Sequence, residues 1–412
     1  MSEFVIERLG HLGDGIAEGP VYVPGALPGE RVAGTLEGNV LREVKIVEPS
    51  GTRVKAPCRH YKSCGGCQLQ HVDDAFLAEW KTGIVREALA AQGIETELRE
   101  IAVSPANARR RAGFSARRTK KGATAGFHAK GSDLIVELSE CHVVVPELLE
   151  GARVAQELAR IGTSRKGELS VSVTLSEAGL DVRVEGGKPL DGPLRISLAQ
   201  LAESEDLARL AWDDETVVTR RPPIQQFDGI AVTPPPGAFL QATKDSERLL
   251  QEEVSAILAG TEPVIDLFAG CGTFALPLAR ARAVHAVEGS AAMTRALDEG
   301  WRHSERLKKV TVEARDLFRQ PIMAEDLKRF GGAVIDPPRA GAEAQCRELA
   351  EAQVPVIAYV SCNPVTFARD AKVLAQAGYE VEWVRPVDQF RWSVHVELVA
   401  AIRHKISCSG QI

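Results

Sequence analysis

Several carboxylates and one thiol stand where short apolar segments of the chain end. Asp266 leads into a glycine-rich loop in which Gly270 and Gly272 let the backbone bend sharply, and Cys362 follows the apolar segment 356–361. If these segments are parallel strands of a doubly wound sheet, their ligand lies at the carboxyl ends of the strands. The thiol is therefore predicted to face whatever the glycine loop binds.

The acids near the loop favour a cationic ligand over a phosphate group. Glu288, Asp316 and Asp336 each follow a further apolar segment, so they are predicted to share the crevice with Asp266. Asp266 would repel a pyrophosphate, but it would attract a sulfonium that carries an amino-acid tail. We assign ribose hydroxyls to Glu288 and an adenine amine to Asp316. A glycine-rich turn with surface acids, and a structural Asp-Pro turn at Asp336, are the alternatives.

Cys362 and Glu397 are the candidates for covalent and acid–base chemistry. Cys362 precedes Asn363-Pro364 and a predicted helix, whose N-terminus would lower the pKa of the thiol. Glu397 lies in the apolar segment 394–402, where burial would raise the pKa of its carboxyl and suit it to accept a proton near neutral pH. An inert core thiol and an ion-paired structural acid are the alternatives.

Four other cysteines have the spacing of a metal site. Cys58, Cys64 and Cys67 form the pattern C-x5-C-x2-C, and Cys141 lies farther along the chain. Zinc ribbons usually supply two matched pairs, whereas three clustered cysteines and a remote fourth suit an iron–sulfur cubane better. Structural zinc stays open as the alternative. The cysteines without a partner at ligand spacing are expected in packing or at the surface: Cys271, Cys346 and Cys408.

The 412 residues divide into three predicted domains. Short strands with glycine turns in residues 1–50 indicate a five-stranded OB-type barrel, which either binds nucleic acid or serves as a spacer. Residues 51–225 read as a central α+β domain with the cysteines, a helix over 80–92 and a basic stretch over 109–121. In residues 226–412 strands alternate with helices, which predicts an α/β, Rossmann-like domain whose parallel-rich sheet is covered on both faces.

The composition of the chain limits the kinds of partner that it can bind. The net charge of -6 argues against a protein that coats nucleic acid through its overall field, so we expect the basic stretch to contact phosphates locally, a solvated face being the alternative. The chain has no membrane-length apolar run and no signal-peptide pattern at its start. We therefore expect a cytoplasmic protein with no membrane partner.

Four motifs together resemble the RNA uracil-C5 methyltransferase family. They are Asp266-Leu-Phe-Ala-Gly-Cys-Gly, Asp336-Pro-Pro-Arg, Ser361-Cys-Asn-Pro and His395-Val-Glu397. The resemblance implies S-adenosyl-L-methionine as cofactor, Cys362 as nucleophile and Glu397 as base. It implies cofactor contacts at these residues: Gln241, Asp266, Phe268, Gly270, Thr273, Glu288, Asp316 and Asp336. The family often has asparagine where this chain has Thr243, which puts that side chain's role in question.

The resemblance also covers the barrel, which is similar to a TRAM domain, and the cysteine segment, where it implies a [4Fe-4S] cluster. Barrel and cluster together favour 23S rRNA as substrate, with tRNA as the alternative, and we expect a monomer. A non-catalytic RNA-binding or ribosome-assembly factor would not need Cys362 and Glu397. A radical methylthiolating enzyme is disfavoured because radical enzymes use C-x3-C-x2-C rather than the spacing found here.

Overall fold

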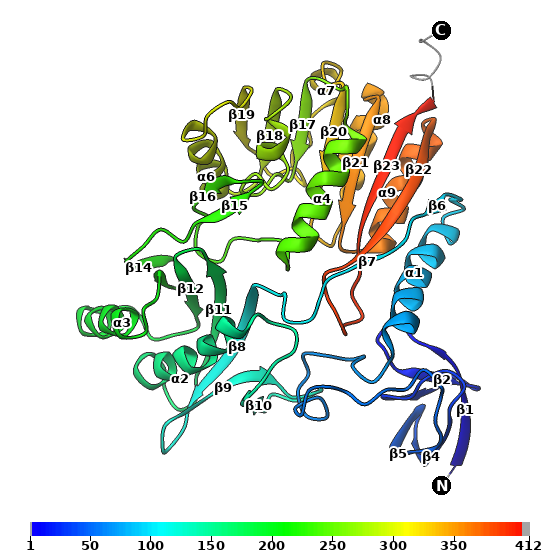
Figure 1. Ribbon diagram of the computed structural model, residues 1–412, viewed down its shortest axis with the longest axis vertical. Helices are drawn as coiled ribbons and strands as arrows, with labels where there is room; N and C mark the ends of the chain where they lie inside the picture. The colour runs from blue at the N-terminus through cyan, green and yellow to red at the C-terminus, as the bar shows by residue number, and fades with distance from the viewer. Residues whose placement is uncertain (1, 406–412) are drawn as a thin grey trace.

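The computed structural model describes residues 2–405, which begin with a closed five-stranded barrel (Figure 1). Buried side chains such as Ile6, Val23 and Leu41 fill its centre. This confirms the barrel predicted for residues 1–50. The residues beyond 405, Cys408 among them, lie outside the described part. The strands, in the order in which they neighbour one another, are β1 (Ser2–Leu9), β2 (Gly15–Ala17), β3 (Val21–Val23), β5 (Val40–Glu48) and β4 (Arg31–Glu37).

The central part of the chain forms a seven-stranded sheet with helices α2 (Glu150–Gly162) and α3 (Gly192–Ser204) packed against it. The strand order is β10 (Ile135–Val136), β9 (Ala123–His128), β8 (Arg111–Arg118), β11 (Glu168–Ser176), β12 (Gly179–Glu185), β13 (Arg209–Trp212) and β14 (Glu215–Thr219). A short hairpin, β15 (Gln225–Phe227) and β16 (Ile230–Val232), leads into the last domain.

The last domain is built on a nine-stranded sheet, predominantly parallel along its first five strands. Its order is β19 (Val310–Ala314), β18 (Val284–Glu288), β17 (Val264–Leu267), β20 (Gly332–Ile335), β21 (Val356–Ser361), β23 (Glu397–His404), β22 (Tyr379–Asp388) and β6 (Glu97–Leu98), with β7 (Ala102–Val103) also paired to β22. Strand β23 runs antiparallel to both of its neighbours. The parallel sheet predicted for this region is therefore confirmed.

Helices cover both faces of this sheet (Figure 1). On one face lie α4 (Lys244–Ile257), α5 (Ala275–Leu278) and α6 (Ala291–Arg302). On the other lie α1 (Asp74–Ala90), α7 (Ala324–Leu327), α8 (Glu343–Ala352) and α9 (Pro364–Gln376). Within residues 2–405, no helix combines the length and the apolar character that crossing a bilayer requires.

The expected boundary of the central domain needs a correction. Helix α1 packs against α9 and β22, and strands β6 and β7 pair with β22. Residues 74–103 therefore belong to the last domain in space, although they precede the central sheet in sequence. The helix also begins earlier than the predicted residue 80, because the side chain of Asp73 caps it by accepting the N–H of Phe76 at 2.7 Å. Deeper in the interface the ammonium of Lys81 donates to Asp388 at 2.6 Å.

Candidate active site and cysteine cavity

A cavity of about 450 Å³ lies where the parallel strands of the last domain end. Most of the residues predicted for cofactor binding and catalysis line it: Phe268, Gly270, Thr273, Glu288, Asp316, Asp336, Cys362 and Glu397. Two others, Gln241 and Asp266, are buried in its wall. Sequence reasoning missed two exposed aromatic residues that line it, Phe239 and Phe318. Both lie on connecting segments without a strand pattern. The sequence feature that could have identified them is a large apolar side chain beside turn residues.

The glycine loop has the backbone that close approach to a ligand requires. Gly272 has a φ of +96°, and a Cβ there would lie 2.8 Å from Cγ of Leu276, so no other residue fits. Beneath the loop, both carboxylate oxygens of Asp266 are buried without a hydrogen-bond partner among the described residues. Burial, and then the charge of Asp336, raise the pKa of Asp266 well above its ordinary value. A cationic group in the cavity would stabilise the ionised form of this acid, so the cavity fits the positively charged sulfonium of S-adenosylmethionine.

Two further acids are held in place by backbone donors. Glu288 accepts the N–H of Gly270 at 3.1 Å and the N–H of Ser290 at 2.8 Å, one on each carboxylate oxygen. Asp316 Oδ1 accepts the N–H of Phe318 at 3.0 Å and the N–H of Arg319 at 3.4 Å, and Oδ2 lies 3.4 Å from Nε of Arg319. Both oxygens of Glu288 and Oδ2 of Asp316 retain a lone pair for a ligand, so these acids have acceptors for the hydroxyl and amine groups predicted for them.

Cys362 sits in a loop that is fixed at both ends. Asn363 caps α9 by accepting the N–H of Val365 at 3.1 Å, and its amide donates to the carbonyl of Arg339 at 2.9 Å. The low pKa expected for the thiol is wrong. Burial, and then the charges of Glu397 and Asp336, raise the pKa of Cys362 to about 11. The helix start does not offset this, because the two acids stand in the same cavity.

Glu397 is the first residue of β23 and is only 2% exposed. The amide of Gln389 donates to Glu397 Oε2 at 2.8 Å and to Gln241 Oε1 at 2.7 Å. Gln241 in turn donates to Asp336 Oδ2 at 3.2 Å. Two glutamines thus join the two acids in one buried chain of hydrogen bonds, and sequence reasoning did not single out Gln389.

The same acids are difficult to ionise together. Burial raises the pKa of Asp336 to about 7. Burial and the charge of Asp336 raise the pKa of Glu397 well above its ordinary value, against the lowering effect of the Gln389 hydrogen bond. The raised pKa predicted for Glu397 follows from these causes, and it makes the carboxyl hold a proton more readily than an exposed glutamate does.

Comparison with known proteins places this site in a family. Residues 234–405 match the sequence profile of the tRNA (uracil-5-)-methyltransferase family. An RNA methyltransferase of Mesorhizobium japonicum is 42% identical, over 97% of this chain and 98% of that protein. The 23S rRNA (uracil(1939)-C(5))-methyltransferase RlmD of Halomonas elongata is 33% identical, over 99% of this chain and 91% of that protein. The chain belongs to the RNA uracil-C5 methyltransferase family. It is an S-adenosylmethionine-dependent enzyme.

The fold agrees with this membership. The tRNA (uracil-54, C5)-methyltransferase of Pyrococcus abyssi, solved in complex with S-adenosyl-L-homocysteine, superposes with a TM-score of 0.75 at 23% identity, over 97% of this chain and 100% of that one. The barrel, the central sheet and the last domain of the methyltransferase therefore share one arrangement with a solved structure.

Thr243, the departure from the family pattern, has a structural role in this methyltransferase. It is the N-cap of α4, where its hydroxyl accepts the N–H of Ser246 at 3.3 Å. Its hydroxyl also lies 2.9 Å from the hydroxyl of Ser104, on the segment that follows β7. Threonine caps helices as asparagine does, so the replacement keeps the helix start.

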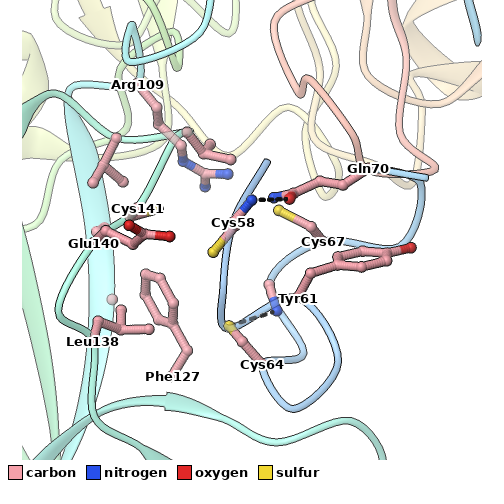
Figure 2. A pocket seen from close by; sticks show the side chains of 15 residues that line it. Cys58, Tyr61, Cys64, Cys67, Gln70, Arg109, Phe127, Leu138, Glu140 and Cys141 are labelled. Carbon is pink, nitrogen blue, oxygen red and sulfur yellow. Dashed lines mark hydrogen bonds between the residues drawn. The ribbon is translucent and has the colours of Figure 1, made fainter. Parts of the chain in front are cut away.

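The predicted metal ligands gather around a second cavity of about 180 Å³ (Figure 2). Cys58, Cys64 and Cys67 lie on one loop and face Cys141 across the cavity. Burial, together with the neighbouring thiols, raises the pKa of Cys67 to about 12. Burial also raises the pKa of Cys58 and of Cys64, so the thiols of this loop hold their protons unless a cation lies beside them.

The cavity is wider than a single ion needs. In residues 2–405, no group of three or more His, Cys, Asp or Glu side chains is spaced to hold one metal ion. A cavity for one water-sized particle requires only about 10–15 Å³, far less than the 180 Å³ here. The four thiols thus line a cavity that has room for more than one ion, and they are not placed to hold a single ion. The other buried cysteines, Cys271 and Cys346, pack in the core as predicted.

The basic stretch divides into buried and exposed arginines. Arg110 is 2% exposed and forms an ion pair with Glu247 of α4, so it joins the central sheet to the last domain. The expectation that this whole stretch contacts phosphates is therefore wrong for Arg110. Arg118, Lys120 and Lys121 are exposed, and phosphate contacts stay a prediction for them.

Proposed function

We propose that the enzyme methylates C5 of a uridine in 23S rRNA through a covalent intermediate on Cys362. The observation that carries the proposal is the placement of Cys362 and Glu397 in one cavity with the strand-end acids. A thiol and a buried carboxyl in the same cavity supply a nucleophile and a base to one bound ring.

The two residues would act in sequence. The thiolate of Cys362 adds to C6 of uracil and pushes electrons to C5, which is otherwise a poor nucleophile. S-adenosylmethionine supplies the methyl group, which its sulfonium makes electrophilic. Glu397 then accepts the proton from C5, the C5–C6 double bond forms again, and the C6–S bond breaks to release the thiolate. Because ionised Glu397 and Asp336 raise the pKa of Cys362, a proton held on this acid pair favours the thiolate.

The remaining site residues would hold the cofactor. We assign the adenosine end to Glu288 and Asp316, whose carboxylates are fixed by backbone N–H groups, and to the aromatic ring of Phe268. We assign the sulfonium end to the loop of Gly270 and Thr273, to Asp266 beneath this loop and to Asp336 beside it. Gln241 acts through Asp336.

For the RNA, we favour 23S rRNA over tRNA. The relative named as a 23S rRNA methyltransferase matches nearly the whole chain at 33% identity. The solved tRNA methyltransferase is only 23% identical, which supports the fold and not the substrate. In either RNA the uridine must leave its stack to enter the cavity. We further propose that the enzyme acts as a monomer in the cytoplasm, where its RNA is made.

The test uses transcripts of 23S rRNA and of tRNA that carry no methylated uridine and in which 5-fluorouridine replaces uridine. Because fluorine at C5 is not removed as a proton is, methyl transfer leaves the RNA attached to Cys362, and the adduct migrates slowly on a denaturing gel. We expect an adduct with 23S rRNA that a Cys362→Ala variant does not form and that a Cys346→Ala variant, which alters a buried thiol of α8 outside the cavity, still forms. An adduct with tRNA alone would replace the substrate assignment, and none with either RNA would refute the mechanism.

For the cysteine cavity, we propose that Cys58, Cys64, Cys67 and Cys141 hold a [4Fe-4S] cluster. Four thiols around a cavity larger than one ion support it. Anaerobically purified protein should contain iron and acid-labile sulfide in equal amounts and absorb broadly in the visible range. Cys141→Ala should lose both, with Cys346→Ala as the control. Zinc without sulfide would overturn the assignment.

A further inference from the structure

A third cavity, of about 340 Å³, lies beside the catalytic one. It is bounded by β8 and β11 of the central sheet and by the segment that leads to Gln241. Phe239 lines both this cavity and the catalytic cavity, and Gln389, whose amide holds Glu397, also lines it. The two cavities are thus neighbours that share a wall, and the size of the third is within the range of small-molecule sites.

This cavity carries positive charge that no protein carboxylate offsets. Arg111, at the start of β8, places its guanidinium over the ring of Phe239, with Cζ 5.6 Å from the ring centre, and donates to the carbonyl of Leu240 at 3.3 Å. Arg109 lines both this cavity and the cysteine cavity, and its Nε donates to the carbonyl of Arg111 at 3.0 Å. Within residues 2–405 neither arginine has a carboxylate at ion-pair distance. Burial and the neighbouring arginines lower the pKa of Arg111. An anion in the cavity would relieve this repulsion.

The cavity also presents flat apolar surfaces. Phe239 is 55% exposed, so its ring is accessible to a ligand in the cavity that it lines. Phe390 and Val173 add to the apolar lining. An arginine above an exposed aromatic ring, next to a pocket for one base, is the combination by which proteins hold unpaired nucleotides: the charge contacts phosphate and the ring stacks on a base.

We propose that this cavity binds a second unstacked nucleotide of the RNA, adjoining the target uridine, with its phosphate on Arg111 and its base against Phe239. The proposal rests on the proposed function in that the catalytic cavity takes a uridine out of a strand. Extruding one nucleotide exposes its neighbour, and a shared wall lets the enzyme receive both. The cavity would thereby fix the strand on either side of the reacting base.

Two variants test separately the charge of Arg111 and the open volume of the cavity. Arg111→Gln removes the cation and leaves the cavity open. Gly113→Val narrows the cavity and leaves the cation, because a Cβ at Gly113 in β8, which also borders the cysteine cavity, meets no heavy atom within 4 Å, and valine suits a strand. Arg295→Gln is the matched control: it removes the same charge from an exposed position on α6, outside the cavity and outside the basic stretch predicted to contact phosphates.

The measurement is the affinity for a fluorescent single-stranded oligouridylate at several salt concentrations. We expect Arg111→Gln and Gly113→Val each to weaken binding about tenfold, as loss of one stacked nucleotide does. Arg111→Gln should also reduce the slope of log affinity against log salt by about 0.7, one phosphate contact on a single strand, whereas Gly113→Val should leave the slope unchanged. Arg295→Gln should change affinity by no more than about twofold.

Two controls keep the outcomes distinct. S-adenosylmethionine binding, measured by calorimetry, should be the same in all three variants, because none of the altered residues lines the catalytic cavity. If Arg295→Gln weakens RNA binding as much as Arg111→Gln, or if Gly113→Val binds as tightly as the unaltered enzyme, the cavity is not a nucleotide site. Failure of methyl transfer to both RNAs would instead count against the proposed reaction, because the binding assay does not depend on it.

Discussion

Replacing Gln389 with leucine should slow proton removal without preventing the covalent step. Gln389 is 2% exposed, and its amide has three partners: Oε2 of Glu397 at 2.8 Å, Oε1 of Gln241 at 2.7 Å and the N–H of Ala242 at 2.7 Å. A buried group left without its hydrogen bond costs about 1–3 kcal/mol. Since three groups lose a partner, we expect the free energy of unfolding to fall by about 3 kcal/mol at least.

The effect on catalysis follows from the pKa of Glu397. The Gln389 hydrogen bond lowers that pKa while burial and Asp336 raise it. A hydrogen bond to a charged group is worth about 1.5–3 kcal/mol, and one pKa unit corresponds to about 1.4 kcal/mol. The leucine variant should therefore need a higher pH for the same fraction of ionised Glu397. At neutral pH the ionised fraction, and with it the rate of proton removal, should fall about tenfold or more.

Single-turnover methyl transfer gives a readout that a loss of stability alone does not produce. Since Cys362 adds before Glu397 acts, the methylated RNA–protein adduct should accumulate in Gln389→Leu on ordinary uridine-containing RNA, and raising the pH should release it. The matched control is Gln345→Leu. Gln345 is 1% exposed and uses both ends of its amide on the backbone of Ile322, away from the site. If both variants lose stability and neither accumulates adduct or shifts its pH profile, Gln389 does not act through Glu397.

Three further predictions concern the thiol, the domain interface and the glycine loop. The ionised Glu397 raises the pKa of Cys362. Glu397→Gln should therefore lower the pKa of this thiol and speed its alkylation by iodoacetamide at mildly alkaline pH, a rate that peptide mass spectrometry measures. An unchanged rate would contradict the proposed effect of Glu397 on the thiol. Arg110→Met leaves the buried Glu247 without its ion-pair partner and should lower the free energy of unfolding in urea by about 3–5 kcal/mol; a change within the 0.5 kcal/mol or so typical of surface substitutions would show that the pair is not needed. Gly272→Ala places a Cβ 2.8 Å from Leu276 at a φ of +96° and should weaken S-adenosylmethionine binding about tenfold by calorimetry; undiminished affinity would mean that the loop tolerates the strain.

The alternation of strands and helices in the last domain could be predicted because each parallel strand is a short, fully buried apolar run. Strands β17, β20 and β21 have no exposed residue, so their sequences carry a strong signal. Strands β6 and β7 have two residues each and no apolar pattern. Their place at the edge of the sheet comes from pairing with β22, a contact that local sequence does not encode, and the domain boundary was misplaced for that reason.

The same distinction applies to the site. Acids that follow apolar segments are predictable as neighbours, because parallel strands bring their carboxyl ends to one edge. The pKa of Cys362 was not predictable, since the charges that raise it come from Glu397 and Asp336 on other strands. Arg110 and Gln389 were missed for a related reason. The local sequence around Arg110 and Gln389 does not indicate that either side chain is buried. Burial makes Arg110 an interface ion-pair partner, and burial makes Gln389 the support of a carboxylate.

The loop between Gln389 and Glu397 connects the cysteine cavity to the catalytic cavity. The carbonyl of Trp392 accepts the N–H of Gln68 at 3.0 Å and the N–H of Leu69 at 2.9 Å, directly after Cys67. The loop that supplies three of the four thiols is thereby hydrogen-bonded to the loop whose two ends are the proposed base and its supporting amide. Any group that fixes the cysteine loop also limits the movement of these two ends. A catalytic carboxyl is effective only where its position is held, so these two hydrogen bonds make the cysteine loop part of the support of the proposed base.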